Sequence, residues 1–470
     1  MVSALDRSTF FLVSAFAFLS LSAASSFAQE QAVKELAQLS LKAGVAVLPN
    51  PVLGSQISAA IPNPHGSAID YRPATGGLSP FNAFFRDFGG NGRSCFSCHS
   101  PIEGWSITPE LIQFRFNASS GTWPIFRPVD GAVCPQADVS TIGARREAYA
   151  LLLKKGLIRI EKGIPENADF ELIAHEGTYC NEITDQKLSL YRRPLPTANL
   201  KYQSTIMWDG RETEEGQSLR DTLRKQAINA HRSHAEAHSD PTDAELDSII
   251  DYQLMVFQAQ MKSNEAGPLN EWGGAAGPVF LSHWGFYEGI NTNPFNPDVF
   301  TIFDGWKQPE SGRPYSSART SVARGQAVFN RKTFLIEGTQ GNQDQAFLGS
   351  CSSCHNTPAV GSHSVPRYFK TGVADALRRA SDMPLYTFRH KQTGETVQLS
   401  DPGRALVSGR WNDLGAFKPV GLRGLSARLP LFHDGSASSI GAVLDHYQKR
   451  FKIDWTREER ADLLAFLKAL

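Results

Sequence analysis

Cys95-Phe96-Ser97-Cys98-His99 is the stretch that best predicts how this chain folds. Two cysteines separated by two residues and followed at once by histidine form the attachment pattern of a c-type haem. Both thiols bond the porphyrin vinyl groups, and the imidazole takes an axial position on the iron. The pattern recurs as Cys351-Ser352-Ser353-Cys354-His355. Because the chain has only six cysteines, we predict two covalently bound c-type haems with His99 and His355 as axial ligands, rather than unrelated thiols or one split metal site.

The length and charge of the chain limit its function. At 470 residues the chain is long enough for two or three domains, and two haem sites suit two domains. Lysine plus arginine and aspartate plus glutamate number 47 each, so the chain has no strong electrostatic field for nucleic acid or an anionic membrane surface. We expect no nucleic-acid partner.

The N-terminus has the pattern of a secretory signal peptide. Arg7 precedes an apolar run over residues 10–21, and the small-residue stretch Ser26-Phe27-Ala28 follows. We predict a signal peptide over residues 1–28; the alternative is an uncleaved membrane anchor. No other apolar stretch approaches about 20 residues, so we expect no membrane span in the mature chain. Export and c-type haem attachment, which occurs outside the cytoplasm in bacteria, together predict the periplasm.

Two cysteines remain after the four that belong to the haem patterns. Cys134 and Cys180 could form a disulfide, which an exported protein tolerates and which would add a few kcal/mol by restricting the unfolded chain. The alternative is two separate buried thiols.

Helical periodicity dominates the chain, and strand signals are few. We expect helices over residues 29–47, 142–157, 218–237, 243–261, 323–329, 440–447 and 458–470. This pattern predicts a mostly α fold of two cytochrome c-like haem domains with long loops and little strand. We predict an N-terminal haem domain at 29–263 with an insertion at about 105–190, a linker at 264–314 rich in Gly, Pro and Asn, and a C-terminal haem domain at 315–470.

Several short motifs lie in a fixed order around the two haem patterns. They are Pro196-Thr197-Ala198-Asn199, Trp208-Asp209-Gly210-Arg211, Arg324-Gly325, Leu422-Arg423-Gly424-Leu425 and Pro430-Leu431-Phe432-His433-Asp434-Gly435. With two haem sites in register, the chain resembles the bacterial di-haem cytochrome c peroxidase and MauG superfamily. The resemblance implies that the N-terminal haem reacts with peroxide and exchanges electrons with the other haem across a tryptophan. Trp208 matches that tryptophan, and its alternative role is a core aromatic.

The same resemblance suggests an axial ligand for the second haem. In the peroxidases this ligand is a methionine on the helix after the Phe-His-Asp-Gly motif, and here the position holds Tyr447. Tyrosine occupies it in MauG-type enzymes, so the resemblance implies an oxygen ligand. The alternatives are a Tyr447 that only packs on its helix and a Met383 supplied from a loop.

The resemblance also implies a glutamine and a glutamate over the first haem, and Gln226 and Glu236 show the family spacing. The carboxylate would move a proton between the two peroxide oxygens, a task worth about 10²–10⁴-fold in rate. His231 and His234 lie between them and are candidates for a sixth iron ligand or for the acid–base group. Each of these histidines could instead be a solvated helix residue.

Calcium binds between the haems in this family, but the matching positions here hold Arg193 and Arg428. Cations at a cation site predict no calcium of that type, unless main-chain oxygens supply the ligands.

Three functions remain open from the sequence. An enzyme would react with hydrogen peroxide, as a cytochrome c peroxidase or a MauG-like oxidase, and would take electrons from a small donor protein or from a protein substrate. A plain electron carrier would have both irons six-coordinate, which the several histidines near the first haem favour. A redox sensor working by ligand exchange is the third.

Overall fold

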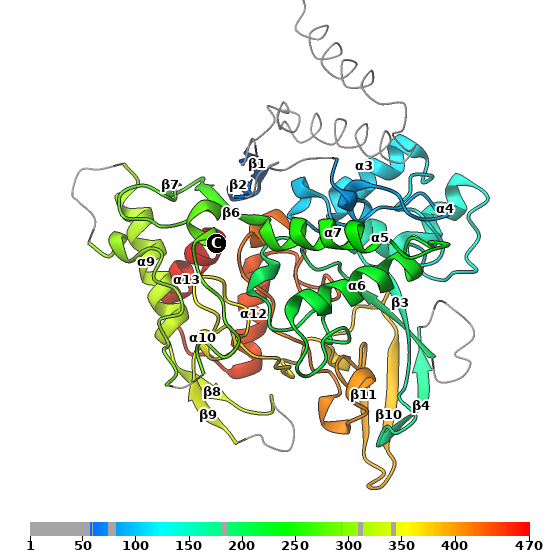
Figure 1. Ribbon diagram of the computed structural model, residues 1–470. Helices are drawn as coiled ribbons and strands as arrows, with labels where there is room; N and C mark the ends of the chain where they lie inside the picture. Colours follow the sequence, from blue (N-terminus) through cyan, green and yellow to red (C-terminus); the bar gives the residue numbers. More distant parts are fainter. Residues whose placement is uncertain are drawn as a thin grey trace, which may run out of the picture.

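Helices α9 (Ser316–Arg331) and α13 (Arg457–Lys468) cross at the centre of the C-terminal half in the computed structural model (Figure 1). The structure describes residues 57–58, 60–73, 81–177, 179, 187–292, 294–308, 314–339 and 345–470. The predicted signal peptide and the predicted helix at 29–47 lie outside these residues. Phe329 and Phe466 are buried where the two helices meet. Gly325 permits the crossing, because a Cβ atom there would lie 1.9 Å from the Asp462 carbonyl oxygen of α13.

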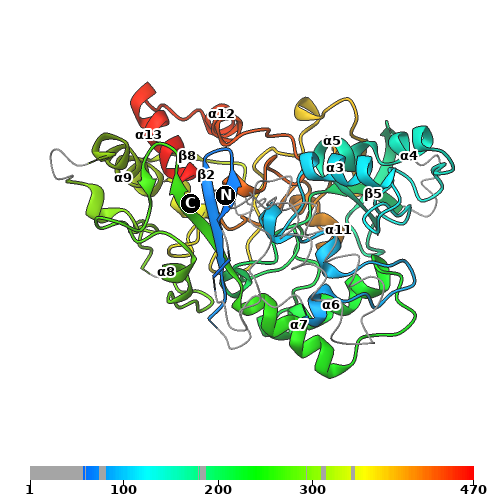
Figure 2. The same cartoon turned by 90° about the horizontal axis from the view of Figure 1, so that it is seen from above.

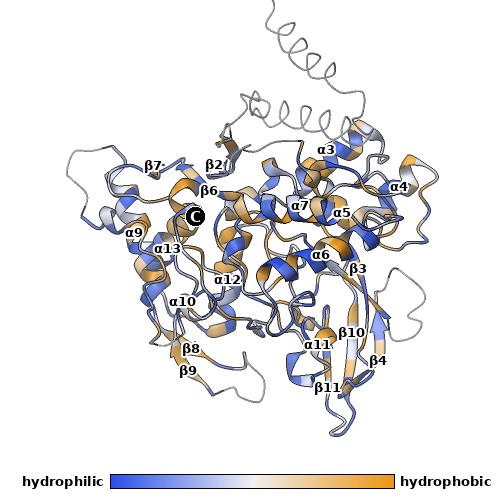
Figure 3. Ribbon diagram, viewed as in Figure 1, coloured by the Kyte–Doolittle hydropathy of each residue, from blue (hydrophilic) through white to orange (hydrophobic). Residues whose placement is uncertain are grey.

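The described residues of the C-terminal half form four more helices. They are α8 (Pro278–Ser282), α10 (Cys351–Cys354), α11 (Ala405–Ser408) and α12 (Ile440–Phe451). Of these, α11 packs away from the crossing of α9 and α13, in the cluster of strands β10 (Leu385–His390) and β11 (Thr396–Leu399). Apolar and polar residues recur along α9, α12 and α13 with the helical period (Figure 3), so each helix turns an apolar face to the core. Phe300, Phe303 and Trp306, from the segment expected to be a linker, belong to the same core. The domain boundaries stay a prediction.

The described residues of the N-terminal half contain five α-helices. They are α3 (Pro109–Ser119), α4 (Ile142–Ala148), α5 (Ala150–Lys155), α6 (Leu219–Ser233) and α7 (Asp243–Met255). Ser218 caps α6, and Thr242 with Glu245 forms a capping box on α7, which explains why both helices begin where they do. Figure 2 shows α3, α4 and α5 on the opposite side of the molecule from α9.

Four small antiparallel sheets complete the described part of the fold. Their strands are β1 (Ile61–Asn63), β2 (Gly66–Tyr71), β3 (Ile158–Gly163), β4 (Phe170–Glu176), β5 (Lys187–Arg192), β6 (Phe257–Ser263), β7 (Gly267–Pro268), β8 (Phe334–Ile336), β9 (Phe347–Gly349), β10 (Leu385–His390) and β11 (Thr396–Leu399). The sheet orders are β1-β2-β6-β7, β11-β10-β4, β3-β5 and β8-β9. Because β4 pairs with β10, one sheet joins the two halves of the chain.

The expectation of a mostly α fold with little strand is wrong. The described residues are about 33% helix and 16% strand. The helix expected at 243–261 ends at Met255, and Val256 turns to extended backbone before β6. The buried side chains of Gln258 and Gln260 on β6 bond Asp70 and Asn63, on or beside the neighbouring strands. Partners distant in sequence therefore decide between strand and helix here, and local periodicity does not report them.

A buried ion-pair network ties the halves together as well. Arg192 at the end of β5 bonds Asp401 at 2.7 Å and Asp209 at 2.7 Å, and all three side chains are at most 2% exposed. Asp209 belongs to the Trp-Asp-Gly-Arg motif, so this network fixes the loop that carries Trp208. Within the described ranges, no helix is long and apolar enough to span a membrane.

Candidate haem sites

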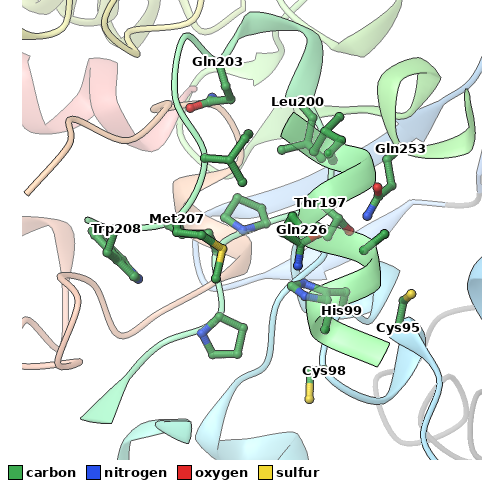
Figure 4. Close-up of a pocket in the computed structure, with 18 of the residues that line it drawn as sticks. Cys95, Cys98, His99, Thr197, Leu200, Gln203, Met207, Trp208, Gln226 and Gln253 are labelled. Carbon is green, nitrogen blue, oxygen red and sulfur yellow. The ribbon is translucent and has the colours of Figure 1, made fainter. Parts of the chain in front are cut away.

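The first haem pattern lines a deep cavity in the N-terminal half. Cys95, Cys98 and His99 lie around the short 3₁₀ helix η2 (Cys95–Ser97), and α6 lies across the cavity from strand and loop residues 192–200 (Figure 4). The cavity holds about 1520 Å³ of empty space, open solvent included. Its exposed lining is mostly apolar, which suits a porphyrin ring.

The His99 ring is oriented by its own loop. Nδ1 donates to the Trp105 carbonyl at 3.1 Å, so Nε2 is the ring nitrogen that would bind a metal, and the Leu195 main chain is a second hydrogen-bond partner of the ring. Burial lowers the pKa of His99 to about 4, so the ring is neutral, as a metal ligand must be. The Trp105 indole donates in turn to the buried Asp70 carboxylate at 2.9 Å.

The second haem pattern lines a matching cavity in the C-terminal half. Cys351 and Cys354 lie on α10, and the Nδ1 atom of His355 donates to the Gly361 carbonyl at 2.6 Å. Burial lowers the pKa of His355 as it does for His99. This cavity holds about 1540 Å³ of empty space, open solvent included, and its exposed lining is more apolar still.

The donor set in each cavity fits a covalently attached haem. Each cavity offers two thiols and one neutral imidazole, and a backbone carbonyl orients the Nδ1 atom of His99 and of His355. Burial raises the pKa of Cys95 and of Cys351 to about 12, so these sulfurs are uncharged thiols. In the first cavity the three guanidinium nitrogens of Arg423 also have no hydrogen-bond partner among the described residues.

Trp208 lines both cavities. Its Nε1 atom donates to the Arg193 carbonyl at 2.8 Å, and its own carbonyl accepts from the Lys418 backbone at 3.0 Å. The indole packs edge-to-face on His433 of the second cavity at 6.3 Å between ring centroids. In the view of Figure 4, Met207 lies between Trp208 and the His99 end of the first cavity.

Helix α6 contributes Gln226 and His231 to the wall of the first cavity, and His234, which directly follows the helix, lines it too. The Nδ1 atom of His231 donates to the Ala227 carbonyl one turn earlier, at 2.6 Å. The Nδ1 atom of His234 donates to Oδ2 of Asp130 at 2.5 Å. Asp130 is 3% exposed, and Arg93 holds its pKa below the usual value although burial alone would raise it. His234 is therefore held by a buried carboxylate.

Glu236 does not line the first cavity. It lies beyond the end of α6 with an exposed side chain, and Oε2 accepts from the Asn91 amide at 2.9 Å. Its φ of 50° belongs to the turn that ends the helix. The structure therefore brings His234 to the cavity wall and leaves Glu236 outside it.

Tyr447 on α12 lines the second cavity, whereas Met383 does not. The Tyr447 ring stacks on Phe451, and burial raises the pKa of its hydroxyl. Met383 is 2% exposed and packs in a separate apolar cluster with Leu151 and Leu157.

Arg193 and Arg428 line both cavities. Arg193 donates to the carbonyls of Lys155, Ile107 and Arg428, and Arg428 donates to those of Arg423 and Gly421. The carbonyl oxygens near these positions are thus already bonded to guanidinium groups.

Sequence reasoning missed Asp130, Met207 and Lys418. Asp130 lies within the expected insertion at about 105–190, and no spacing in the sequence links it to His234.

Cys134 is disulfide-bonded, and Cys180 lies outside the described residues.

Comparison with known proteins finds two cytochrome c peroxidases. The chain is 27% identical over 173 residues to cytochrome-c peroxidase IdrP1 of Pseudomonas sp. (strain SCT), which is 32% of this chain and 40% of that protein. It is 31% identical over 136 residues to cytochrome c551 peroxidase of Nitrosomonas europaea, which is 27% of this chain and 34% of that protein. The aligned part is therefore less than half of either relative. No protein-family model matches the chain.

Among solved structures, the chain is similar to a MauG-like protein associated with microbial copper homeostasis. The two are 17% identical with a TM-score of 0.34, over 62% of this chain and 76% of the other. That score is too low to establish a common fold. The two curated relatives confirm the resemblance to the di-haem peroxidase and MauG superfamily, and they support a peroxidase-like haem oxidoreductase.

Proposed function

We propose that this protein is a periplasmic oxidoreductase that carries two covalent c-type haems and reduces hydrogen peroxide, or acts as a MauG-like oxidase. The observation that carries the proposal is the pair of cavities, each lined by its own two cysteines and histidine and both lined by Trp208. Peroxide reduction to water needs two electrons and two protons. The partners would be a small electron-donor protein or a protein substrate.

The residues that would hold each cofactor follow from the cavity walls. Cys95 and Cys98 would bond the first haem and Cys351 and Cys354 the second, with His99 and His355 as the proximal ligands. Bound haem supplies an iron that accepts and donates single electrons and that activates peroxide. Trp208 lines both sites and would carry electrons between them.

Tyr447 is the proposed second axial ligand in the C-terminal cavity. It lines that cavity from α12, and its buried phenol has a raised pKa, so binding to a metal would displace the proton. The separate packing of Met383 favours Tyr447 over that alternative.

His234 is the proposed acid–base group of the first cavity, with Asp130 as its positioning residue. The hydrogen bond from Nδ1 to Asp130 leaves Nε2 of His234 to take and return the peroxide proton. Gln226 would orient peroxide from the same helix face. Glu236 is exposed and lies off the cavity wall, which favours the histidine over the glutamate predicted from family spacing.

A direct test begins with protein matured in a host that attaches c-type haem. Mass spectrometry should show two added haems, and the reduced protein should consume peroxide in stopped-flow measurements. The Trp208→Phe variant should keep both haems yet slow the oxidation of the second haem about tenfold or more, a barrier increase of about 1.4 kcal/mol or more. Trp411→Phe is the matched control, because Trp411 lines neither cavity. No added haem, or equal rates in both variants, would contradict the proposal.

A plain electron carrier is the second candidate, and one observation favours it. Three imidazoles, those of His99, His231 and His234, line the first cavity, so two of them could bind one iron and leave no open position. An electron paramagnetic resonance spectrum separates the two functions. A wholly low-spin ferric spectrum in the oxidised and the half-reduced protein supports the carrier, and a high-spin ferric component in either state supports the enzyme.

A further inference from the structure

Buried arginines in this molecule divide into two groups. Eight arginines are less than 9% exposed among the described residues, and five of them have a carboxylate oxygen within 4.0 Å; they are Arg93, Arg115, Arg159, Arg192 and Arg319. The other three, Arg193, Arg423 and Arg428, have no ion pair in the part of the chain that the structure describes. All three line the first cavity.

Lys418 belongs with these three arginines. It is 6% exposed, and among the described residues its ammonium group donates only to the Gln203 side chain at 3.1 Å and the Thr205 carbonyl at 2.7 Å. Lys418, Arg193 and Arg428 line both cavities, and Arg423 lines the first alone. We call Arg193, Lys418, Arg423 and Arg428 the inter-cavity cations.

Their surroundings do not neutralise them. Arg428 donates only to the carbonyls of Arg423 and Gly421, both at 2.6 Å, and Arg423 donates to nothing among the described residues. The charge of the Glu103 carboxylate raises the pKa of Arg193, but Glu103 already forms an ion pair with Arg115. Burial lowers the pKa of Lys418 to about 7 and that of Arg423 to about 10, and neither side chain has an ion pair among the described residues.

A buried cation without an anion lowers the stability of the folded protein. The other five buried arginines of the described residues each have a carboxylate partner. Removing a charge from water costs several kcal/mol unless a partner and hydrogen bonds compensate. Arg192, which is equally buried, has two carboxylates. The contrast implies that the inter-cavity cations have anionic partners that come from outside the polypeptide.

We propose that the inter-cavity cations bind the propionate carboxylates of the two haems and hold both sets between the cavities, on either side of Trp208. This inference rests on the proposed function, because it needs a haem in each cavity. A propionate is a carboxylate, which matches the planar fork of an arginine through two parallel hydrogen bonds. Arg423 would bind the first haem, and the cations that line both cavities would act on both haems.

The proposal predicts how charge removal changes the reduction potentials. A positive charge beside a haem favours the reduced iron, so Arg423→Met should lower the potential of the first haem and leave the second nearly unchanged. Arg428→Met should lower both potentials. Arg423→Lys keeps the positive charge, so the reduction potential of the first haem should stay close to that of the wild type. Arg331→Met is the control, because Arg331 is 62% exposed and pairs with Asp298 at the surface.

Spectroelectrochemistry of the purified holoprotein tests this, with haem content measured by mass spectrometry on the same samples. The two transitions are assigned with Tyr447→Phe, which alters the second cavity alone. Two haems with potentials unmoved by Arg423→Met and Arg428→Met would overturn this inference and leave the proposed function intact. A wild-type chain that takes up no haem would overturn both. If the Arg423→Met protein does not fold and accumulate in the host, Lys418→Met provides the same measurement. The reduction potentials of both haems should then fall, and unchanged potentials would count against the proposal.

Discussion

The carboxylate of Asp130 is the sharpest place to test how the first cavity works. It accepts hydrogen bonds from His234 and Arg93, and it is 3% exposed. Asp130→Asn keeps the size of the side chain and removes its charge. The substitution therefore separates the electrostatic role of this residue from its packing.

Two effects of different size should follow. A hydrogen bond to a charged group contributes about 1.5–3 kcal/mol, and it matters most when His234 holds the proton, so peroxide reduction should slow on the order of 10- to 100-fold. Arg93, which is 2% exposed, would lose the one carboxylate that pairs with it among the described residues. Breaking a buried ion pair costs about 3–5 kcal/mol. Arg93 would keep its hydrogen bonds to the carbonyls of Pro124, Ile125 and His234. We therefore expect the free energy of unfolding to fall by an amount near the lower end of that range.

Stopped-flow rates and denaturant unfolding measure the two effects separately. His234→Ala should slow the reaction and leave the Arg93–Asp130 ion pair intact, so it should avoid the loss of stability that comes from breaking that pair. The double variant with Asp130→Asn should react no more slowly than His234→Ala, because Asp130 acts through His234. Asp138→Asn, an exposed aspartate of the same segment, is the control. Multiplied rate losses in the double variant, or an unchanged rate in Asp130→Asn, would refute the role of this pair.

Two further predictions concern the C-terminal half. Tyr447→Phe should remove an oxygen ligand and change the second haem from low-spin to high-spin while the first keeps its spectrum; Met383→Leu should change neither, and the opposite result would transfer the role to Met383. Gly325→Ala should lower the free energy of unfolding by about 1–3 kcal/mol, because the added methyl would meet the Asp462 carbonyl of α13 at 1.9 Å. Gly441→Ala has no atom nearer than 3.6 Å and should raise it by up to about 1 kcal/mol, so equal effects at the two glycines would contradict the packing argument.

Helices were the features that sequence predicted best, because their signals are local. The expected helix at 218–237 corresponds to α6, the one at 458–470 to α13, and the one at 142–157 to α4 and α5 with a break at Tyr149. Capping residues and apolar spacing within one segment determine these elements. The motifs around the two haem patterns could likewise be identified from short segments of sequence. The curated relatives confirm the family resemblance that the order of these motifs indicated.

The sheets and the composition of the cavity walls depended on the tertiary structure. Strand β4 becomes a strand by pairing with β10, which lies more than two hundred residues later, and a sequence pattern does not report a partner at that distance. The same holds for the site. His234 and Asp130 are separated by 104 positions, and nothing in either neighbourhood marks them as a pair.

The sequence by itself predicted which residues attach a cofactor, because a Cys-x-x-Cys-His pattern carries its chemistry within five consecutive residues. Only the tertiary structure decided that Trp208 lines both cavities and that His234 rather than Glu236 faces the first. It also decided that four buried cations line these cavities with no ion pair among the described residues. The physical reason is that charge and contact act through space. Burial turns an ordinary arginine into a binding group only when folding has removed both water and every acidic neighbour.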